Sequence, residues 1–288
     1  MTELPKDLRV VTAPNPSPLT GAGTNTFLLG RDQVAVIDPG PDLPAHRAAI
    51  LAAVGAGRIS HILVTHAHLD HSEGAAALSR ACGAPILGFG PAEAGRSPLM
   101  QRLAAQGGIQ GGEGLDRTFS PDTCLRDGDL VETSEWRLRA IHTPGHFAGH
   151  LSFGYENRIF CGDVVMGWSS TLISPPDGDL GDYFRSLARL EAEDAAMLLP
   201  AHGAPITSSA ARLAELAAHR RARTAQILAA LAEAPRTPAE LARRIYDIPD
   251  HLHRAASRNV LAHLIALAEL GAVTPRGALS AEAVFQIG

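Results

Sequence analysis

The peptide THAHLDH, residues 65–71, directly follows the three apolar residues Ile-Leu-Val. An apolar, β-branched run of this kind is typical of a buried strand. Side chains two positions apart on extended backbone point to the same side, so His66 and His68 can bind one metal ion together. The chain then turns into a helix, which sends Asp70 and His71 to a neighbouring position. One short segment can therefore serve two metal ions.

Other predicted strands also end in ligand-type residues. These strands cover Trp136–Ile141, Arg158–Cys161 and Met197–Leu199. After the first, a Pro-Gly turn aims His146 inward; after the second, Gly162 permits close backbone approach and Asp163 offers a carboxylate that can bridge two cations. His202 follows the third strand. Four strand ends thus present seven ligand-type side chains: His66, His68, Asp70, His71, His146, Asp163 and His202.

Several polar residues near these ligands are candidates for supporting roles. His142 and His150 flank His146 at equal spacing, and the turn geometry favours His146 as the ligand, so we interpret the flanking pair as residues that support the ligands or face the substrate. The loop after Asp163 adds candidates for substrate contact, namely Trp168, Ser170 and Thr171. Packing of the tryptophan over the sheet edge is the alternative.

The chain divides into two parts near residue 206. Of 28 Gly and 20 Pro, residues 1–206 hold 25 and 16, and there short strands and helices are interleaved, which predicts a layered α/β domain over residues 1–206. The glycine-rich stretch 88–114 is interpreted as a mobile loop with a short helix around Leu99–Ala105. Residues 207–288 have the order helix, helix, helix, hairpin, which is that of a winged helix-turn-helix. A helical extension that packs on the first domain or makes a homodimer is the alternative.

Composition excludes several classes of protein. The 288 residues are 45% hydrophobic, and 25 Lys+Arg against 30 Asp+Glu give a formal net charge of -5. No apolar stretch reaches the roughly 18 residues of a membrane span, and the N-terminus lacks the pattern of a secretory signal, so we expect a cytoplasmic protein. Three cysteines without CxxC spacing argue against a disulfide framework and against a thiolate zinc knuckle.

The motifs HAHLDH, TPGHFAGH, CGD and PAHG, taken in order, resemble those of the metallo-β-lactamase-fold hydrolases. The resemblance implies a four-layer αββα sandwich that binds one metal through His66, His68 and His146, a second through Asp70, His71 and His202, and Asp163 between the two. It is nearest to the beta-lactamase-like protein two branch, whose chains similarly continue into a C-terminal winged helix. Zn²⁺ suits a histidine-rich open site, so we expect two zinc ions, with Fe or Mn as alternatives.

The expected activity is hydrolysis by a hydroxide held between the two metals, with Asp70 orienting it. Fold alone does not choose the substrate. The resemblance favours cleavage of single-stranded RNA and places it slightly ahead, whereas the acidic first domain favours a small acyl ester, thioester or lactone. RNA would need local cations such as Arg254 and Arg258. A metal-sensing DNA-binding protein is a weaker alternative, and we expect no membrane partner.

Overall fold

The computed structural model describes residues 4–109 and 114–288. Two mixed sheets form its centre. The first contains β1 (Leu8–Thr12), β2 (Asn25–Leu29), β3 (Gln33–Ile37), β4 (Arg58–Leu63), β5 (Ile86–Gly88) and β6 (Thr123–Cys124) in that order. The second has the order β11 (Met197–Pro200), β10 (Arg158–Gly162), β9 (Leu151–Tyr155), β8 (Arg137–His142) and β7 (Leu130–Glu132). In both sheets antiparallel and parallel pairs occur together, because β3 to β6 run parallel and β11 runs parallel to β10.

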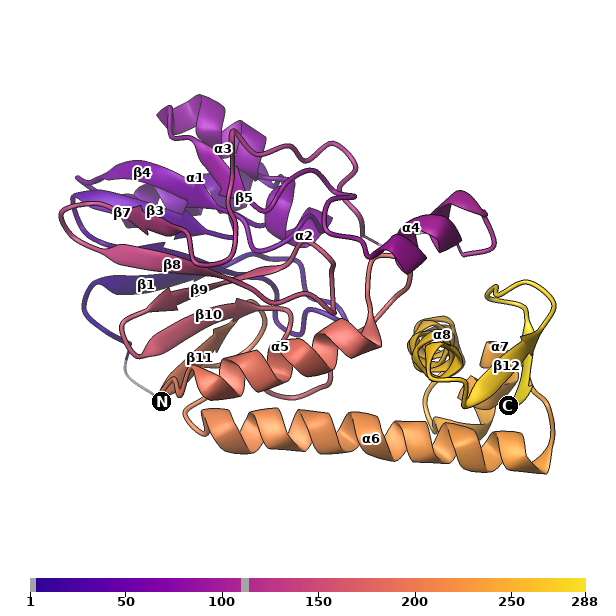
Figure 1. The fold of residues 1–288 in the computed structure, drawn as a ribbon. Coiled ribbons are helices and arrows are strands. Elements are labelled where there is room, and N and C mark those ends of the chain that lie inside the picture. The colour runs from indigo at the N-terminus through magenta and orange to yellow at the C-terminus, as the bar shows by residue number, and fades with distance from the viewer. Residues whose placement is uncertain (1–3, 110–113) are drawn as a thin grey trace.

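Helices cover the outer face of each sheet, which gives the four-layer αββα sandwich expected from the sequence (Figure 1). The apolar faces of the two sheets meet in a core where the Phe27 and Phe160 rings contact edge to face at 5.1 Å between centroids. The helices α1 (Pro44–Val54) and α3 (Ala75–Cys82) pack on the first sheet, and α5 (Leu180–Ala192) packs on the second. Strand β3 is buried on both faces, as its continuous apolar run predicts.

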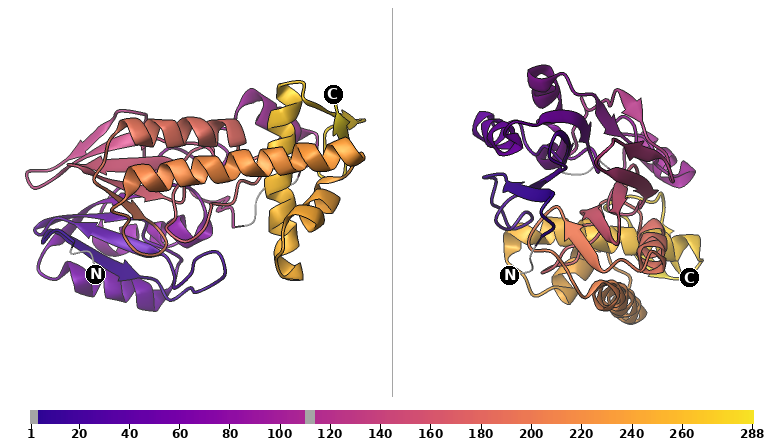
Figure 2. Two further views of the ribbon diagram at one scale, coloured as in Figure 1. Left: turned by 90° about the horizontal axis from the view of Figure 1, so that it is seen from below. Right: turned by 90° about the vertical axis from the view of Figure 1, so that its left-hand side faces the viewer.

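The C-terminal region has the order predicted for a winged helix. It comprises α6 (Ser209–Glu233), α7 (Pro238–Ile245), the 3-10 turn η1 (Asp250–Leu252), α8 (His253–Glu269) and the hairpin β12 (Val273–Arg276) with β13 (Val284–Ile287). Helix α7 begins with a capping box, in which Thr237 and Glu240 satisfy each other's backbone N–H groups. Figure 2 shows α6 running from the sandwich to the far side of α8, so one helix spans both parts of the molecule.

The two parts interlock through the segment between β5 and β6. Helix α4 (Pro98–Ala105), close to the short helix predicted there, places Met100 and Leu103 in the hydrophobic cluster of α6, α7 and α8 (Figure 1). In return, Leu213 and Leu216 of α6 pack with α5 against the second sheet. Residues 110–113 of the predicted loop lie outside the described residues. A domain boundary at residue 206 stays a prediction.

None of the helices in the described ranges is both long enough and apolar enough to cross a membrane.

Candidate metal centre and substrate cleft

The seven ligand-type side chains named from the sequence meet at one end of the sandwich. The segment after β4 and the helix α2 (Leu69–Ser72) carry four of them, and the ends of β8, β10 and β11 lead to the other three. Their ligand atoms form three overlapping groups in which all atoms lie within 4.8 Å of one another. Such convergence of side chains from four strand ends is what a metal centre requires.

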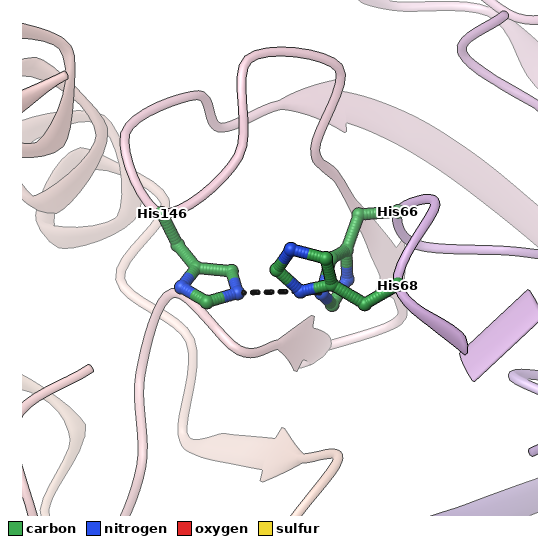
Figure 3. A group of neighbouring side chains, drawn as sticks. All are labelled: His66, His68 and His146. Atoms are coloured by element: carbon green, nitrogen blue, oxygen red, sulfur yellow. Dashed lines mark hydrogen bonds between the residues drawn. The ribbon is translucent and has the colours of Figure 1, made fainter. Parts of the chain in front are cut away.

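Three imidazoles form the first group and point toward one another (Figure 3). His68 Nδ1 lies 2.9 Å from His66 Nε2 and 3.2 Å from His146 Nε2. Two nitrogens that bind one zinc ion at about 2.05 Å with tetrahedral geometry are about 3.3 Å apart. The three nitrogens are therefore spaced for a shared cation.

The second group combines Asp70, His71 and His202, with Asp163 between the two groups. Asp70 Oδ2 lies 3.4 Å from His71 Nε2 and 3.3 Å from His202 Nε2. Asp163 Oδ2 lies 3.6 Å from His71 Nε2 and 3.8 Å from His146 Nε2, and its Oδ1 lies 3.3 Å from His202 Nε2. Asp163 thus faces ligand atoms of both groups. This donor set fits two divalent cations.

Hydrogen bonds to Nδ1 turn Nε2 toward the site in three of the imidazoles, those of His71, His146 and His202. His71 Nδ1 donates to the carboxylate of Asp38 at 3.0 Å, and His146 Nδ1 donates to the Leu172 carbonyl at 2.6 Å. Because these oxygens only accept, Nδ1 carries a proton in both residues, so a cation would bind through Nε2. His202 Nδ1 similarly faces the Gly23 carbonyl at 3.2 Å.

Asp38 is a functional residue that the sequence reasoning did not single out. It is buried, directly follows β3, and also accepts from the Thr65 N–H and hydroxyl, both at 2.8 Å. Thr65 in turn lies next to His66, whose Nδ1 is 3.0 Å from its Oγ1. Because the Thr65 hydroxyl donates its proton to Asp38, its oxygen accepts a hydrogen bond from His66 Nδ1. The signal available in the sequence was an aspartate directly after a buried strand.

Burial and charge divide the histidines into two classes. Burial lowers the pKa of His68 to about 3 and also lowers those of His66 and His146. Burial acts the same way on His71 and His202, but the facing carboxylates outweigh it, raising the pKa of His202 to about 10 and that of His71 well above its ordinary value. Three imidazoles are thus neutral at pH 7, whereas two hold protons that a cation must displace.

The absence of a side chain at Gly162 lets the His150 imidazole lie against the backbone that leads to Asp163. Gly162 has φ +48°, and a Cβ there would lie 2.4 Å from His150 Nε2. His150 is fully buried, accepts from the Asp163 N–H at 3.2 Å, and contacts the Thr143 hydroxyl at 2.8 Å through Nδ1. It thus contacts the backbone of the residue between the two groups, and a supporting rather than a ligating role for His150 stays a prediction.

Other sequence candidates lie farther from the centre. His142 contacts the Ala148 carbonyl at 2.9 Å and stacks on Phe89, so it braces the turn that carries His146. Arg258 donates to Ser174 at 3.0 Å, and Arg254 lies one turn earlier on α8 and is exposed.

The metal centre opens into a cleft of about 670 Å³ between the sandwich and the C-terminal region. Trp168, Ser170 and Thr171 line it, and their contact with a substrate stays a prediction. The opposite wall comes from α6, from the residues between α7 and α8 and from the start of α8. It combines Leu216, Tyr246, Ile248, Leu252, Ala255 and Ala256 with the polar residues Arg212, Glu215, His219, Arg223 and Asn259. The start of α8, the third helix of the winged-helix order, thus turns Ala255, Ala256 and Asn259 toward this cleft.

Comparison with protein families gives two matches. Residues 19–202 match the model of the metallo-beta-lactamase superfamily. Residues 237–278 match the beta-lactamase associated winged helix domain. Together the two matches cover the centre, most of the sandwich and the region from α7 to β12.

Individual relatives extend over most of the chain. An atrochrysone carboxyl ACP thioesterase of Aspergillus chevalieri is 31% identical over 80% of this chain and 67% of its own length. A beta-lactamase-like protein 2 homolog of Caenorhabditis elegans is 29% identical over 90% of this chain and 83% of its own. The chain spans 61% to 68% of the length of several fungal relatives.

Solved structures agree with the fold. The metallo-beta-lactamase family protein TTHA1429 of Thermus thermophilus superposes with a TM-score of 0.79 at 29% identity, over 98% of this chain and 99% of its own. The protein TTHA1623, solved in a di-iron-bound form, has a TM-score of 0.53 at 26% identity and covers 70% of this chain and 96% of its own.

Proposed function

Because the chain belongs to the metallo-beta-lactamase superfamily, we propose that it hydrolyses a small acyl thioester or ester with two divalent cations. The observation that carries this proposal is the cleft, whose volume suits a small molecule and whose surface as a whole is more apolar than polar. A relative that is named an ACP thioesterase supports the same substrate class. In the reaction water adds across the acyl bond, so the carbonyl carbon gains a hydroxyl group and the thiol or alcohol leaves with a proton.

The residues of the chain have distinct roles in this proposal. One cation would be held by His66, His68 and His146. The other would be held by Asp70, His71 and His202, and Asp163 lies where it could bind both. Two cations bound there supply hydroxide at neutral pH and polarise the acyl oxygen. Thr24 lies 3.4 Å from Asp70 Oδ2 and fixes the carboxylate that orients the attacking water. Zinc is the proposed cation, with iron, which TTHA1623 binds, or manganese as alternatives.

The test is a substrate panel with metal-loaded protein. We expect turnover of an acyl thioester to exceed that of a lactone, of bis-p-nitrophenyl phosphate and of single-stranded RNA. Asp70→Asn should abolish this turnover, whereas Asp182→Asn, which changes a carboxylate on α5 outside the cleft, should retain it. Turnover confined to the phosphodiesters would refute the acyl proposal.

Single-stranded RNA, placed slightly ahead by the sequence alone, is the second candidate. The match to the beta-lactamase-like protein 2 homolog over 90% of this chain favours it. Its need for several phosphate contacts counts against it, because the net charge is -5 and Arg258, one of the two candidate arginines, is engaged internally. Arg258 donates to Ser174 at 3.0 Å, whereas Arg254 is exposed.

A further inference from the structure

Arg220 of α6 is a buried cation without a carboxylate partner among the described residues. Its side chain is among the largest that are fully buried, and 1% of the residue is exposed. One terminal nitrogen donates to the Thr171 carbonyl, the other donates to Asn259 Oδ1 at 3.1 Å, and the guanidinium lies 5.4 Å from the centre of the Tyr183 ring. Burying a charge without a counter-ion is costly, so this arginine is a poor choice for stability alone.

The two partners of Arg220 converge on one segment of the chain, residues 171–173. Asn259 of α8, besides accepting from Arg220, accepts from the Ile173 N–H at 2.9 Å. The carbonyl of Thr171 accepts from Arg220 directly. Both ends of the segment are therefore fixed by side chains of the C-terminal region.

The other side of the same segment holds a candidate metal ligand. The Leu172 carbonyl accepts from His146 Nδ1 at 2.6 Å, and the Thr171 hydroxyl lies 2.9 Å from the same nitrogen. The Leu172 carbonyl keeps the proton on Nδ1 and thereby leaves Nε2 free to bind a cation. A shift of the segment would remove this control, because a hydrogen bond weakens steeply with distance and angle.

We propose that Arg220 and Asn259 are positioning residues that hold segment 171–173 so that the Leu172 carbonyl fixes the tautomer and orientation of His146. The C-terminal region thereby acts on the metal centre without contributing a ligand. This inference rests on the proposed function only in taking His146 as a ligand, and it does not depend on the substrate. The tautomer and orientation of His146 in the first cation site therefore depend on the docking of α6 and α8 against the sandwich.

The test compares Arg220→Met with Arg221→Met, which changes the neighbouring exposed arginine that lies over Phe184. Zinc binding is measured by competition with a chromogenic chelator, and the tautomer of His146 by nitrogen-15 NMR of the metal-free protein. Substitutions behind a ligand lower metal affinity by about 10- to 100-fold. We expect about a tenfold loss for one of the two zinc ions in Arg220→Met, a mixed His146 tautomer, and no change in Arg221→Met.

Two further variants keep the proposal testable if Arg220→Met fails to fold. Asn259→Ala removes a neutral, half-buried side chain and should give the same effects in weaker form, whereas Arg220→Lys should restore part of the zinc affinity by donating to one partner. Unchanged zinc affinities together with an unchanged His146 tautomer in Arg220→Met or Asn259→Ala would overturn the proposal. A protein that binds zinc as expected but cleaves no thioester would instead contradict the proposed function alone.

Discussion

Replacing Asp38 by asparagine should weaken the second cation site. The carboxylate accepts three hydrogen bonds, from the Thr65 N–H and hydroxyl and from His71 Nδ1. An amide has one oxygen and one NH₂ group, so at least one buried donor must then face another donor. Asparagine suits the backbone, because residue 38 has φ +53° and asparagine tolerates this left-handed conformation. The change therefore tests side-chain chemistry alone.

The magnitude follows from these contacts. A buried donor left unsatisfied costs about 1–3 kcal/mol of the free energy of unfolding. If the NH₂ group faces His71, that imidazole must move its proton to Nε2 and can no longer bind a cation through it. Loss of such support lowers metal affinity by about 10- to 100-fold, or about 1.4–2.7 kcal/mol.

The assay is zinc titration against a chromogenic chelator, together with urea unfolding of the metal-free protein. The zinc constant of the site that contains His71 should weaken by the stated factor. Asp42→Asn is the matched control, because Asp42 is four residues away and forms an ion pair with Arg47 that is partly exposed. Two unaltered zinc constants in Asp38→Asn would refute the reasoning.

Further predictions concern the metals, pH, the backbone and salt. Elemental analysis should find close to two cations per chain; Asp163→Ala should lose most of this metal and His150→Ala less, and equal losses would contradict the assigned roles. Because the pKa values of His71 and His202 are raised, their contribution to the stability of metal-free protein is complete below about pH 6.5 and is lost as pH rises, for His202 through about 10. Zinc binding at pH 7 should therefore release about two protons, measured by calorimetry in buffers of different ionisation enthalpy; no release would show that both imidazoles are neutral. Gly162→Ala should lower the free energy of unfolding by more than about 2 kcal/mol in urea titrations, because its new Cβ would meet His150 at a positive φ, and a neutral effect would contradict that geometry. Thioester turnover should change little between 50 and 200 mM salt, whereas RNA cleavage would fall steeply, by about 0.7 in logarithmic slope per phosphate held.

Local patterns predicted much of the fold. Strands β10 and β11 begin at the predicted residues and run one residue beyond their predicted ends, because short apolar runs are signals carried within a few residues. Strands β1, β5, β6 and β7 were not identified. Strands β6 and β7 have only two and three residues, and β1 is a half-buried edge, so each depends on its neighbours in the sheet rather than on its own sequence.

The site divides in the same way. The ligand-type residues follow predicted strands, so their sequence positions carry the signal, and the structure brings all seven together. Nothing local distinguishes Arg220 from the other arginines of an alanine-rich helix. Its partners Thr171 and Asn259 are 49 and 39 residues away, so its role arises only when α6 and α8 dock on the sandwich.

The packing of α4 against the C-terminal cluster determines when this core can form during synthesis of the chain. Met100 and Leu103 leave the ribosome long before Leu264 and Phe285, with which they share a core. At about 5–20 residues per second, this interval lasts roughly 10–40 s. During that time the apolar face of α4 lacks its final partners, and the far wall of the cleft does not yet exist. A nascent chain can thus complete its sandwich well before the cleft has its far wall, which forms only when nearly the whole polypeptide has been made.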